Sequence, residues 1–257
     1  MDFIQSKFHQ KQQNRRGSAD ESPIISNERL NYEISRSSFE RLQPGRWLND
    51  EVINAYIKLI NDRTAQKSLT NAYVMNTFFY TMLEEMAKRG DYSFAKIERC
   101  LRRQKVDLKA YALTLIPVNL THSHWLFLAV DFKAWTVYVI DSIGCAQELA
   151  QGYLDVVRPF LNDFQGNSSI EWTIEVTQSI PKQLNGFDCG LCTCVNMELL
   201  SRTNASQTGL MFFDTRKAIG SIRYDMGDHM FSEDARKRVA VELMFGELLT
   251  SVEQQQQ

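Results

Sequence analysis

The chain has 257 residues, of which 44% are hydrophobic, and its 29 basic and 31 acidic side chains give a formal net charge of −2. This much apolar material supports a packed core, while 12 glycines, 5 prolines and no fixed-period repeat exclude collagen-like and solenoid chains. The nearly balanced charge argues against nucleic acid as the main partner. No apolar run approaches the ~20 residues that span a bilayer, so we expect a soluble protein with no membrane partner.

Cysteine usage points to a reducing compartment. The chain has five cysteines, an odd number, and its first residues lack the continuous apolar stretch of a secretory signal. In a reducing compartment cysteines are free thiols, so each of them is a candidate for thiolate chemistry.

One domain is expected between two tails. Residues 1–24 are rich in Gln, Lys, Arg and Ser, and residues 252–257 end in a glutamine run. Such segments bury too little apolar surface to offset the entropy that is lost on ordering, so we expect both to be disordered. Residues 25–251 contain no linker rich in Gly, Ser or Pro, which favours a single domain there.

The first predicted elements are two helices and then a group of strands. Asn49 and Asp50 are good N-cap residues, and the apolar residues behind them recur every three to four positions, which predicts a helix over 50–61. Residues 78–88 show the same period. Short runs dense in branched and aromatic residues predict strands buried on both faces, over Tyr111–Val118, Trp125–Phe132, Trp135–Ile140 and Ile170–Thr177. Lys133 and Ala134 suggest a hairpin, although neither residue favours a positive φ.

Helices are expected to surround this sheet. Apolar residues between Gln147 and Phe164 are spaced as in a helix that Pro159 kinks or restarts. Two C-terminal helices follow, and Ser232 is a suitable cap for the second of them. The inward face of that second helix is predicted to carry Val239, Leu243, Met244 and Leu248. The chain therefore predicts an α+β fold with a central, mostly antiparallel sheet.

A histidine and an aspartate flank the predicted hairpin. His124 lies at the start of one strand and Asp141 follows the other, so antiparallel pairing would bring the acid beside the base. A histidine at a strand edge is more often structural than catalytic, and an aspartate after a strand often only starts a turn. The residues alone leave these structural roles open.

Cys189 lies where a polar, glycine-containing loop enters a predicted helix. The free N–H groups and the dipole of a first helical turn favour an anion, which lowers the pKa of a thiol placed there. Asp188 is the residue type that caps such a helix, and Gly190 would let the backbone approach a substrate carbonyl closely.

The cysteines of this helix have two alternative roles. Cys189, Cys192 and Cys194 lack a matching second pair of ligands, and the other cysteines and the histidines show no zinc-like spacing, so we expect no metal. Packing as small apolar side chains suits Cys192 and Cys194. It suits Cys189 poorly, because a polar loop precedes it.

Five segments, in order along the chain, give it a specific resemblance. They are Arg46–Asn54 (RWLNDEVIN), Asn76–Tyr80 (NTFFY), Pro117–Trp125 (PVNLTHSHW), Val139–Ser142 (VIDS) and Pro181–Gly190 (PKQLNGFDCG). Over about residues 30–250 the chain resembles the Ulp/SENP family of SUMO-specific cysteine proteases, the adenain-like relatives of papain. The resemblance implies a papain-like fold in which the nucleophile lies at a helix N-terminus.

The resemblance also implies a role for each candidate residue. Cys189 would be the nucleophile, His124 its general base and acid, Asp141 the carboxylate that orients His124, and Gln183 a donor to the oxyanion. Trp47 and Trp125 match tryptophans that line a narrow tunnel over the substrate's Gly-Gly tail. Asp50 matches a position near that tail, and no cofactor is implied.

The implied activity is cleavage after the C-terminal Gly-Gly of SUMO, both from lysines of conjugates and from the SUMO precursor. The implied partners are SUMO or another ubiquitin-like modifier and its conjugates, met by a monomer in the nucleus or cytoplasm. Three alternatives remain: a protease for ubiquitin or for the neddylation modifier, an acetyltransferase of the same clan, and an inactive modifier-binding module. Acetyltransferases of the clan typically carry Glu where this chain has Asp141.

Overall fold

The computed structural model describes residues 23–67, 71–177, 180–202 and 233–249. In chain order its main elements are β1 (Pro23–Asn27), β2 (Tyr32–Ser35), α2 (Arg36–Phe39), α3 (Asp50–Gln66), β3 (Ala72–Val74), α4 (Phe78–Arg89), α5 (Phe94–Gln104), β4 (Leu113–Leu120), β5 (His124–Asp131), β6 (Thr136–Ile140), α6 (Gln147–Gln165), β7 (Thr173–Val176), α7 (Cys189–Arg202) and α9 (Glu233–Phe245). Short 3-10 turns lie at Glu40–Leu42 and Leu108–Ala110. The predicted α+β class is confirmed.

A mixed sheet forms the centre of the described residues. Its strand order is β3-β4-β5-β6-β7, and the two central pairings, β4 with β5 and β5 with β6, are antiparallel. The two outer pairings are parallel, so antiparallel pairing is confined to the middle of the sheet. The expected burial on both faces holds for β4, β5 and β6 and is wrong for β7, which is an edge strand and stays partly exposed.

The side chain of Asp131 holds the turn of the hairpin between β5 and β6. Asp131 Oδ1 accepts hydrogen bonds from the backbone N–H groups of Lys133 and Ala134, both at 2.9 Å. Trp135, the last residue of the connection, has a φ of 52° and so adopts the left-handed conformation. The predicted hairpin is therefore confirmed, with the positive φ at Trp135 rather than at the two residues between the predicted strands.

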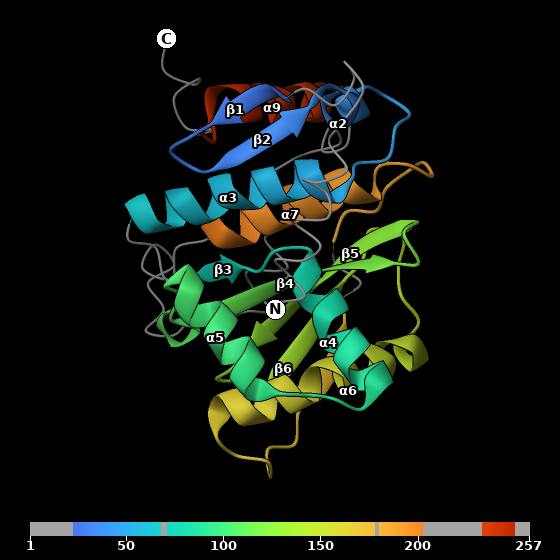
Figure 1. Ribbon diagram of the computed structural model, residues 1–257. Coiled ribbons are helices and arrows are strands. Elements are labelled where there is room, and N and C mark those ends of the chain that lie inside the picture. Colours follow the sequence, from blue (N-terminus) through green and yellow to red (C-terminus); the bar gives the residue numbers. More distant parts are fainter. Residues whose placement is uncertain (1–22, 68–70, 178–179, 203–232, 250–257) are drawn as a thin grey trace, which may run out of the picture.

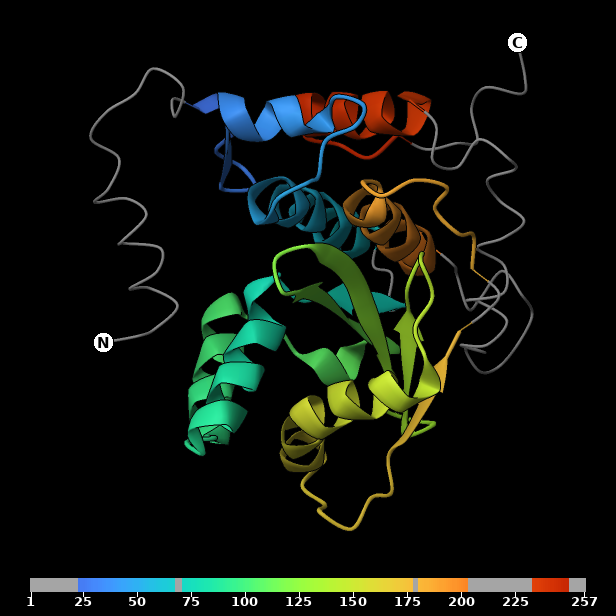
Figure 2. The same ribbon diagram turned by 90° about the vertical axis from the view of Figure 1, so that its right-hand side faces the viewer.

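Helices cover both faces of the sheet (Figures 1 and 2). α7 packs on β5, and α3 packs on α7 over one face, where they share a core with Trp125, Phe127 and Ala129. α4 and α6 cover the opposite face, and α5 packs against α6 there. Alternate side chains of β5 thus enter two separate cores, as the two-residue period of a strand requires.

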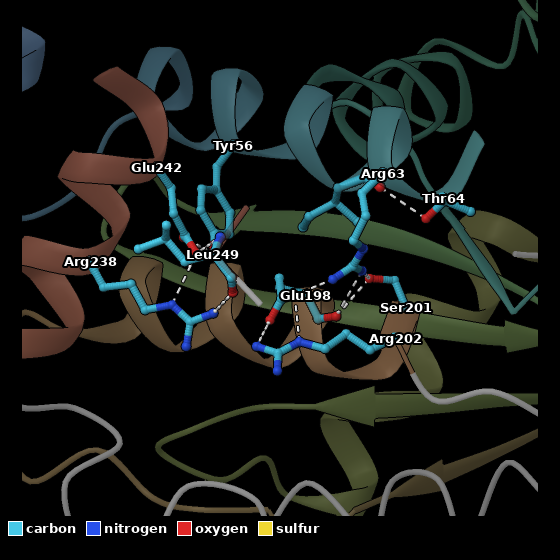
Figure 3. Close-up of polar contacts among 10 residues, drawn as sticks. Tyr56, Arg63, Thr64, Glu198, Ser201, Arg202, Arg238, Glu242 and Leu249 are labelled. Atoms are coloured by element: carbon cyan, nitrogen blue, oxygen red, sulfur yellow. Dashed lines mark hydrogen bonds and ion pairs between the residues drawn. The ribbon is translucent and has the colours of Figure 1, made fainter. Parts of the chain in front are cut away.

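A further layer lies beyond α3 and α7, made of α9 and the β1–β2 hairpin (Figure 1). Two fully or almost fully buried glutamates connect these helices (Figure 3). Glu242 on α9 accepts hydrogen bonds from Tyr56 of α3 at 2.8 Å and from Arg238 at 3.0 Å. Glu198 on α7 pairs with Arg63 of α3 and with Arg202. Buried carboxylates with this many partners fix how the helices dock.

Some expectations about the helices are corrected. The helix over 147–165 continues through Pro159 as one element, so it does not restart there. Met244 is 61% exposed and therefore does not face inward, although Val239 and Leu243 are buried as predicted. Ser232 and both predicted tails, apart from residues 23 and 24, lie outside the described residues; β1 begins at Pro23.

Candidate active site

His124 and Asp141 are neighbours in the folded chain. His124 is the first residue of β5, and Asp141 directly follows β6, which pairs antiparallel with β5. His124 Nε2 lies 2.8 Å from Asp141 Oδ1, and the backbone N–H of Ile143 donates to the same oxygen at 3.0 Å. The carboxylate is therefore fixed, and it holds the imidazole in one orientation.

Cys189 lies against the same imidazole. It is the first residue of α7, the helix that packs on β5, and its sulfur lies close enough to His124 for that imidazole to lower the pKa of the thiol. Since Asp141 occupies Nε2 of the ring, Nδ1 is the nitrogen that remains for the sulfur. The backbone N–H groups of Trp125 and Gly190 also lower the pKa of this thiol. The structure thus brings Cys189, His124 and Asp141 together in one row.

The pKa values of this row favour a charged pair. Burial raises the pKa of the Cys189 thiol, but hydrogen bonds from His124 and the backbone, together with the charge of His124, lower it below its usual value. Hydrogen bonds to Asp141 and Cys189 raise the pKa of His124 to about 9, against the opposing effect of burial. Burial likewise raises the pKa of Asp141, and its bonds to His124 and Ile143 bring it below the usual value. Both the lowered pKa of Cys189 and the raised pKa of His124 move the pair toward a thiolate beside an imidazolium.

The loop before Cys189 is ordered by two side chains. Asn185 Oδ1 accepts hydrogen bonds from the backbone N–H groups of Phe187 and Asp188, both at 3.0 Å. The Asp188 carbonyl accepts the first bond of α7, from Cys192 N–H at 2.8 Å. Asp188 thus holds the predicted cap position, but its buried carboxylate pairs with Arg236 of α9 and with Asn185.

Gln183 is tied to the segment that follows Asp141. Its Oε1 accepts a hydrogen bond from Ser142 Oγ at 2.6 Å, and its Nε2 donates to the Asn185 carbonyl at 2.6 Å. Its backbone N–H donates to the Ser142 carbonyl at 3.0 Å. The side-chain amide nitrogen is therefore held toward the loop that leads to Cys189, while the role of oxyanion donor stays a prediction.

A pocket of about 190 Å³ opens beside Cys189, and the predicted substrate residues Trp47, Asp50 and Trp125 line it. The other lining residues are Arg41, Leu48, Asn49, Asn119, His122 and Ser123. Trp47 is 47% exposed and its indole N–H donates to the Gly186 carbonyl at 2.9 Å, whereas Trp125 is almost fully buried and donates to the Leu48 carbonyl at 3.0 Å. The N-cap of α3 is Asn49, so Asp50 is not needed as a cap.

Gly190 has a packing role that the sequence did not indicate. A Cβ on it would lie 2.9 Å from Leu48 Cβ and 3.3 Å from Trp125 Cδ1. The missing side chain therefore lets α7 approach the pocket wall. The expected close approach of the backbone to a substrate carbonyl stays a prediction.

Replacing Gly190 with alanine is expected to destabilise the protein by about 1–3 kcal/mol, because overpacking pushes α7 away from Leu48 and Trp125. Urea unfolding measures the loss. The control is Gly152→Ala on α6, where a Cβ meets no atom within 4 Å and alanine is the better helix former. Equal stability of the two variants would contradict the packing role.

The described residues contain no group of three or more His, Cys, Asp or Glu side chains arranged to hold a metal ion. No helix in this part of the chain is long and apolar enough to cross a membrane.

The comparisons with known proteins agree with this geometry. Residues 46–227 match the family described as "Ulp1 protease family, C-terminal catalytic domain". The chain belongs to the Ulp1 protease family. The matched residues include every candidate site residue, from Trp47 to Cys189, and they end before α9.

Individual members of the Ulp1 family are moderately similar. Ubiquitin-like-specific protease 1A of Arabidopsis thaliana is 29% identical over 190 residues, which are 71% of this chain and 37% of that protein. Sentrin-specific protease 2 of Homo sapiens is 32% identical over 178 residues, which are 66% of this chain and 28% of that protein. The chain therefore spans little more than a third, at most, of these two relatives.

A solved structure of the Ulp1 family has the same fold. The SUMO protease Ulp1 with its catalytic cysteine oxidised to a sulfonic acid matches 96% of each chain, with 25% identity and a TM-score of 0.62. The expected papain-like, adenain-like architecture is thereby confirmed as that of the Ulp1 catalytic domain.

Two residues of the site were missed by sequence reasoning. Ser142 was noted only as part of a motif, although it directly follows Asp141. Arg236 lies 48 positions beyond Asp188. An arginine among several other charged residues of a helix carries no local signal that it is buried.

Proposed function

We propose that the chain is a cysteine isopeptidase and endopeptidase that cleaves after the C-terminal Gly-Gly of SUMO, acting on conjugated lysines and on the SUMO precursor. The observation that carries this proposal is the row of Cys189, His124 and Asp141 at the mouth of a pocket walled by tryptophans. Similar proteins named for SUMO and for ubiquitin-like modifiers supply the substrate class.

The chemistry follows from the protonation states. The Cys189 thiolate attacks the carbonyl carbon of the terminal glycine, and a C–S bond forms as the carbonyl becomes a tetrahedral oxyanion. The backbone N–H of Cys189 and the amide of Gln183 serve as donors to this oxyanion. His124, whose pKa is raised to about 9, is protonated at neutral pH and gives its proton to the departing lysine amine. Water then attacks the thioester, with His124 as the base.

The pocket supports selection of a tail without side chains. Trp47 is fixed by its bond to Gly186, on the loop that leads to Cys189, and Trp125 is fixed by its bond to Leu48. Two held indoles form a rigid wall, and a narrow space between rigid walls admits glycine and excludes a Cβ. We place this activity in the nucleus or cytoplasm and assign it to a monomer, with no cofactor.

Electrophilic probes test the substrate. SUMO, ubiquitin and the neddylation modifier, each carrying a C-terminal electrophile, are incubated with the protein, and the adduct is mapped by mass spectrometry. We expect the SUMO probe to label Cys189 and the Cys189→Ala variant to stay unlabelled while still binding SUMO. Labelling by only ubiquitin or only the neddylation modifier would assign the protease to that modifier. No labelling by any of the three would overturn the proposal.

A further inference from the structure

Ser142 is clamped to Gln183 at two points. Its hydroxyl donates to Gln183 Oε1 at 2.6 Å, and its carbonyl accepts from the Gln183 backbone N–H at 3.0 Å. Ser142 is 4% exposed, and it directly follows Asp141. The clamp therefore connects the segment of Asp141, which orients the proposed general base, to Gln183, the proposed oxyanion donor. The two ends of the clamp are 41 positions apart in the sequence.

The orientation of a side-chain amide decides what it can do for an oxyanion. Nε2 has two N–H groups and can donate, whereas Oε1 has only lone pairs and repels a negative charge. The two ends have nearly the same shape, so packing alone does not distinguish them. An amide turned by 180° would place Oε1 beside the oxyanion and would destabilise it.

Polar partners on both sides distinguish the two orientations of Gln183. The Asn185 carbonyl accepts from Nε2 at 2.6 Å, and in the turned orientation it would face Oε1, a second acceptor. On the other side of the amide, the Ser142 hydroxyl donates its single proton to Oε1. One of the two Nε2 protons then remains for an oxyanion, since only the other is used by Asn185.

Cys192 lies near Ser142, one turn after Cys189 on α7, and is 1% exposed. Burial raises the pKa of the Cys192 thiol well above its usual value, against the smaller, opposite effect of the Ser142 hydroxyl, so the thiol keeps its proton. An uncharged thiol is a weak acceptor and does not compete with Gln183 Oε1 for the Ser142 proton.

We propose that Ser142 is a positioning residue that keeps the amide nitrogen of Gln183 available to the oxyanion. The inference rests on the proposed function, in which Gln183 stabilises the oxyanion. Because Ser142 acts only through Gln183, its loss costs no more than the loss of Gln183 itself, and it leaves the ionisation of Cys189 unchanged.

A double-mutant cycle tests this dependence. kcat and KM are measured with a fluorogenic C-terminal amide of SUMO for Gln183→Ala, Ser142→Ala, the double variant and Ser142→Thr. Removal of an oxyanion donor costs about 10²–10³-fold in kcat, which is the loss that we expect for Gln183→Ala. We expect Ser142→Ala to lose about 10-fold in kcat with little change in KM, as part of that range. The double variant should equal Gln183→Ala, and Ser142→Thr should recover most of the loss.

Two further measurements separate positioning from general damage. Thermal unfolding reports whether each variant folds, and the pH dependence of Cys189 alkylation reports the thiol pKa, which should not move in Ser142→Ala. If Ser142→Ala does not fold, Ser142→Cys, which keeps a weak donor, takes its place in the cycle and should show a smaller loss of kcat in the same direction.

The outcomes that overturn the inference differ from those that overturn the proposed function. Losses that multiply in the double variant would show that Ser142 acts independently of Gln183, and an unchanged kcat in Ser142→Ala would show that it does not act at all. If Gln183→Ala itself keeps full kcat, the oxyanion role in the proposed function fails, and the role of Ser142 fails with it.

Discussion

Replacing His124 with alanine is expected to lower kcat by about 10²–10⁴-fold, the range that general acid–base catalysis contributes. The variant loses the group that we propose protonates the departing amine. It also loses the hydrogen bond and the charge that lower the pKa of Cys189, so that burial, the largest influence on this thiol, acts against fewer opposing interactions. The expected result is both a slower reaction and a less ionised nucleophile.

The same variant makes a pH prediction with a definite sign. In the unaltered protein, we expect activity to rise as pH passes the lowered pKa of Cys189, because the thiolate forms. We expect activity to fall as pH passes about 9, because His124 loses the proton that it would donate. In His124→Ala the pH midpoint of Cys189 alkylation by iodoacetamide should move upward. His122→Ala, which removes the imidazole in the turn between β4 and β5, is the control and should not move it. An unmoved midpoint in His124→Ala would contradict the charged pair.

Replacing Arg236 with glutamine is expected to destabilise the protein by about 3–5 kcal/mol, the usual cost of breaking a buried ion pair. The side chains of Arg236 and Asp188 are each 3% exposed. Arg236 also donates to the carbonyls of Arg41 and Gln43, both at 3.0 Å, and to that of Arg46 at 2.8 Å. Its loss leaves the buried Asp188 carboxylate, next to Cys189, without its cationic partner. It also removes the hydrogen bonds that hold the loop before Trp47. Activity should therefore fall as well.

Urea unfolding measures this effect. Lys237→Gln, at the next position of α9, is the matched control. The ion pair of Lys237 with Asp234 is exposed, and exposed ion pairs contribute about 0–1 kcal/mol to stability. Adding Asp188→Asn to Arg236→Gln removes the orphaned charge and should restore part of the stability. The interpretation would be wrong if Arg236→Gln cost no more than Lys237→Gln.

Local sequence patterns were sufficient to predict that His124 and Asp141 lie side by side. Two strands joined by a short connection pair antiparallel, so the start of the first and the end of the second meet at one edge. The position of Cys189 also followed from local sequence, because a polar loop before an apolar helix marks a helix start. Neither inference needed knowledge of distant contacts.

Distant contacts explain the residues that local patterns missed or misplaced. The need for glycine at position 190 comes from Leu48 and Trp125, which belong to other parts of the chain. Met244 fits a helical period, yet the side of α9 on which it lies is not covered in the described structure. Pro159 lies within a helix whose packing against the sheet and α4 outweighs the lost backbone bond. For Gly190 the deciding partners are remote in sequence, and for Met244 and Pro159 the deciding factor is how the helix packs on the rest of the fold.

The ion pair between Arg236 and Asp188 determines how far a functional fragment of this protein must extend. The match to the Ulp1 family model ends at residue 227, whereas the arginine that neutralises the residue before Cys189 comes nine positions later. A fragment cut at residue 227 would keep Cys189, His124 and Asp141 but would lose Arg236, and the buried Asp188 carboxylate would then have no cationic partner. The ion pair, rather than the end of the family match, sets the C-terminal limit of a stable fragment, which must include α9.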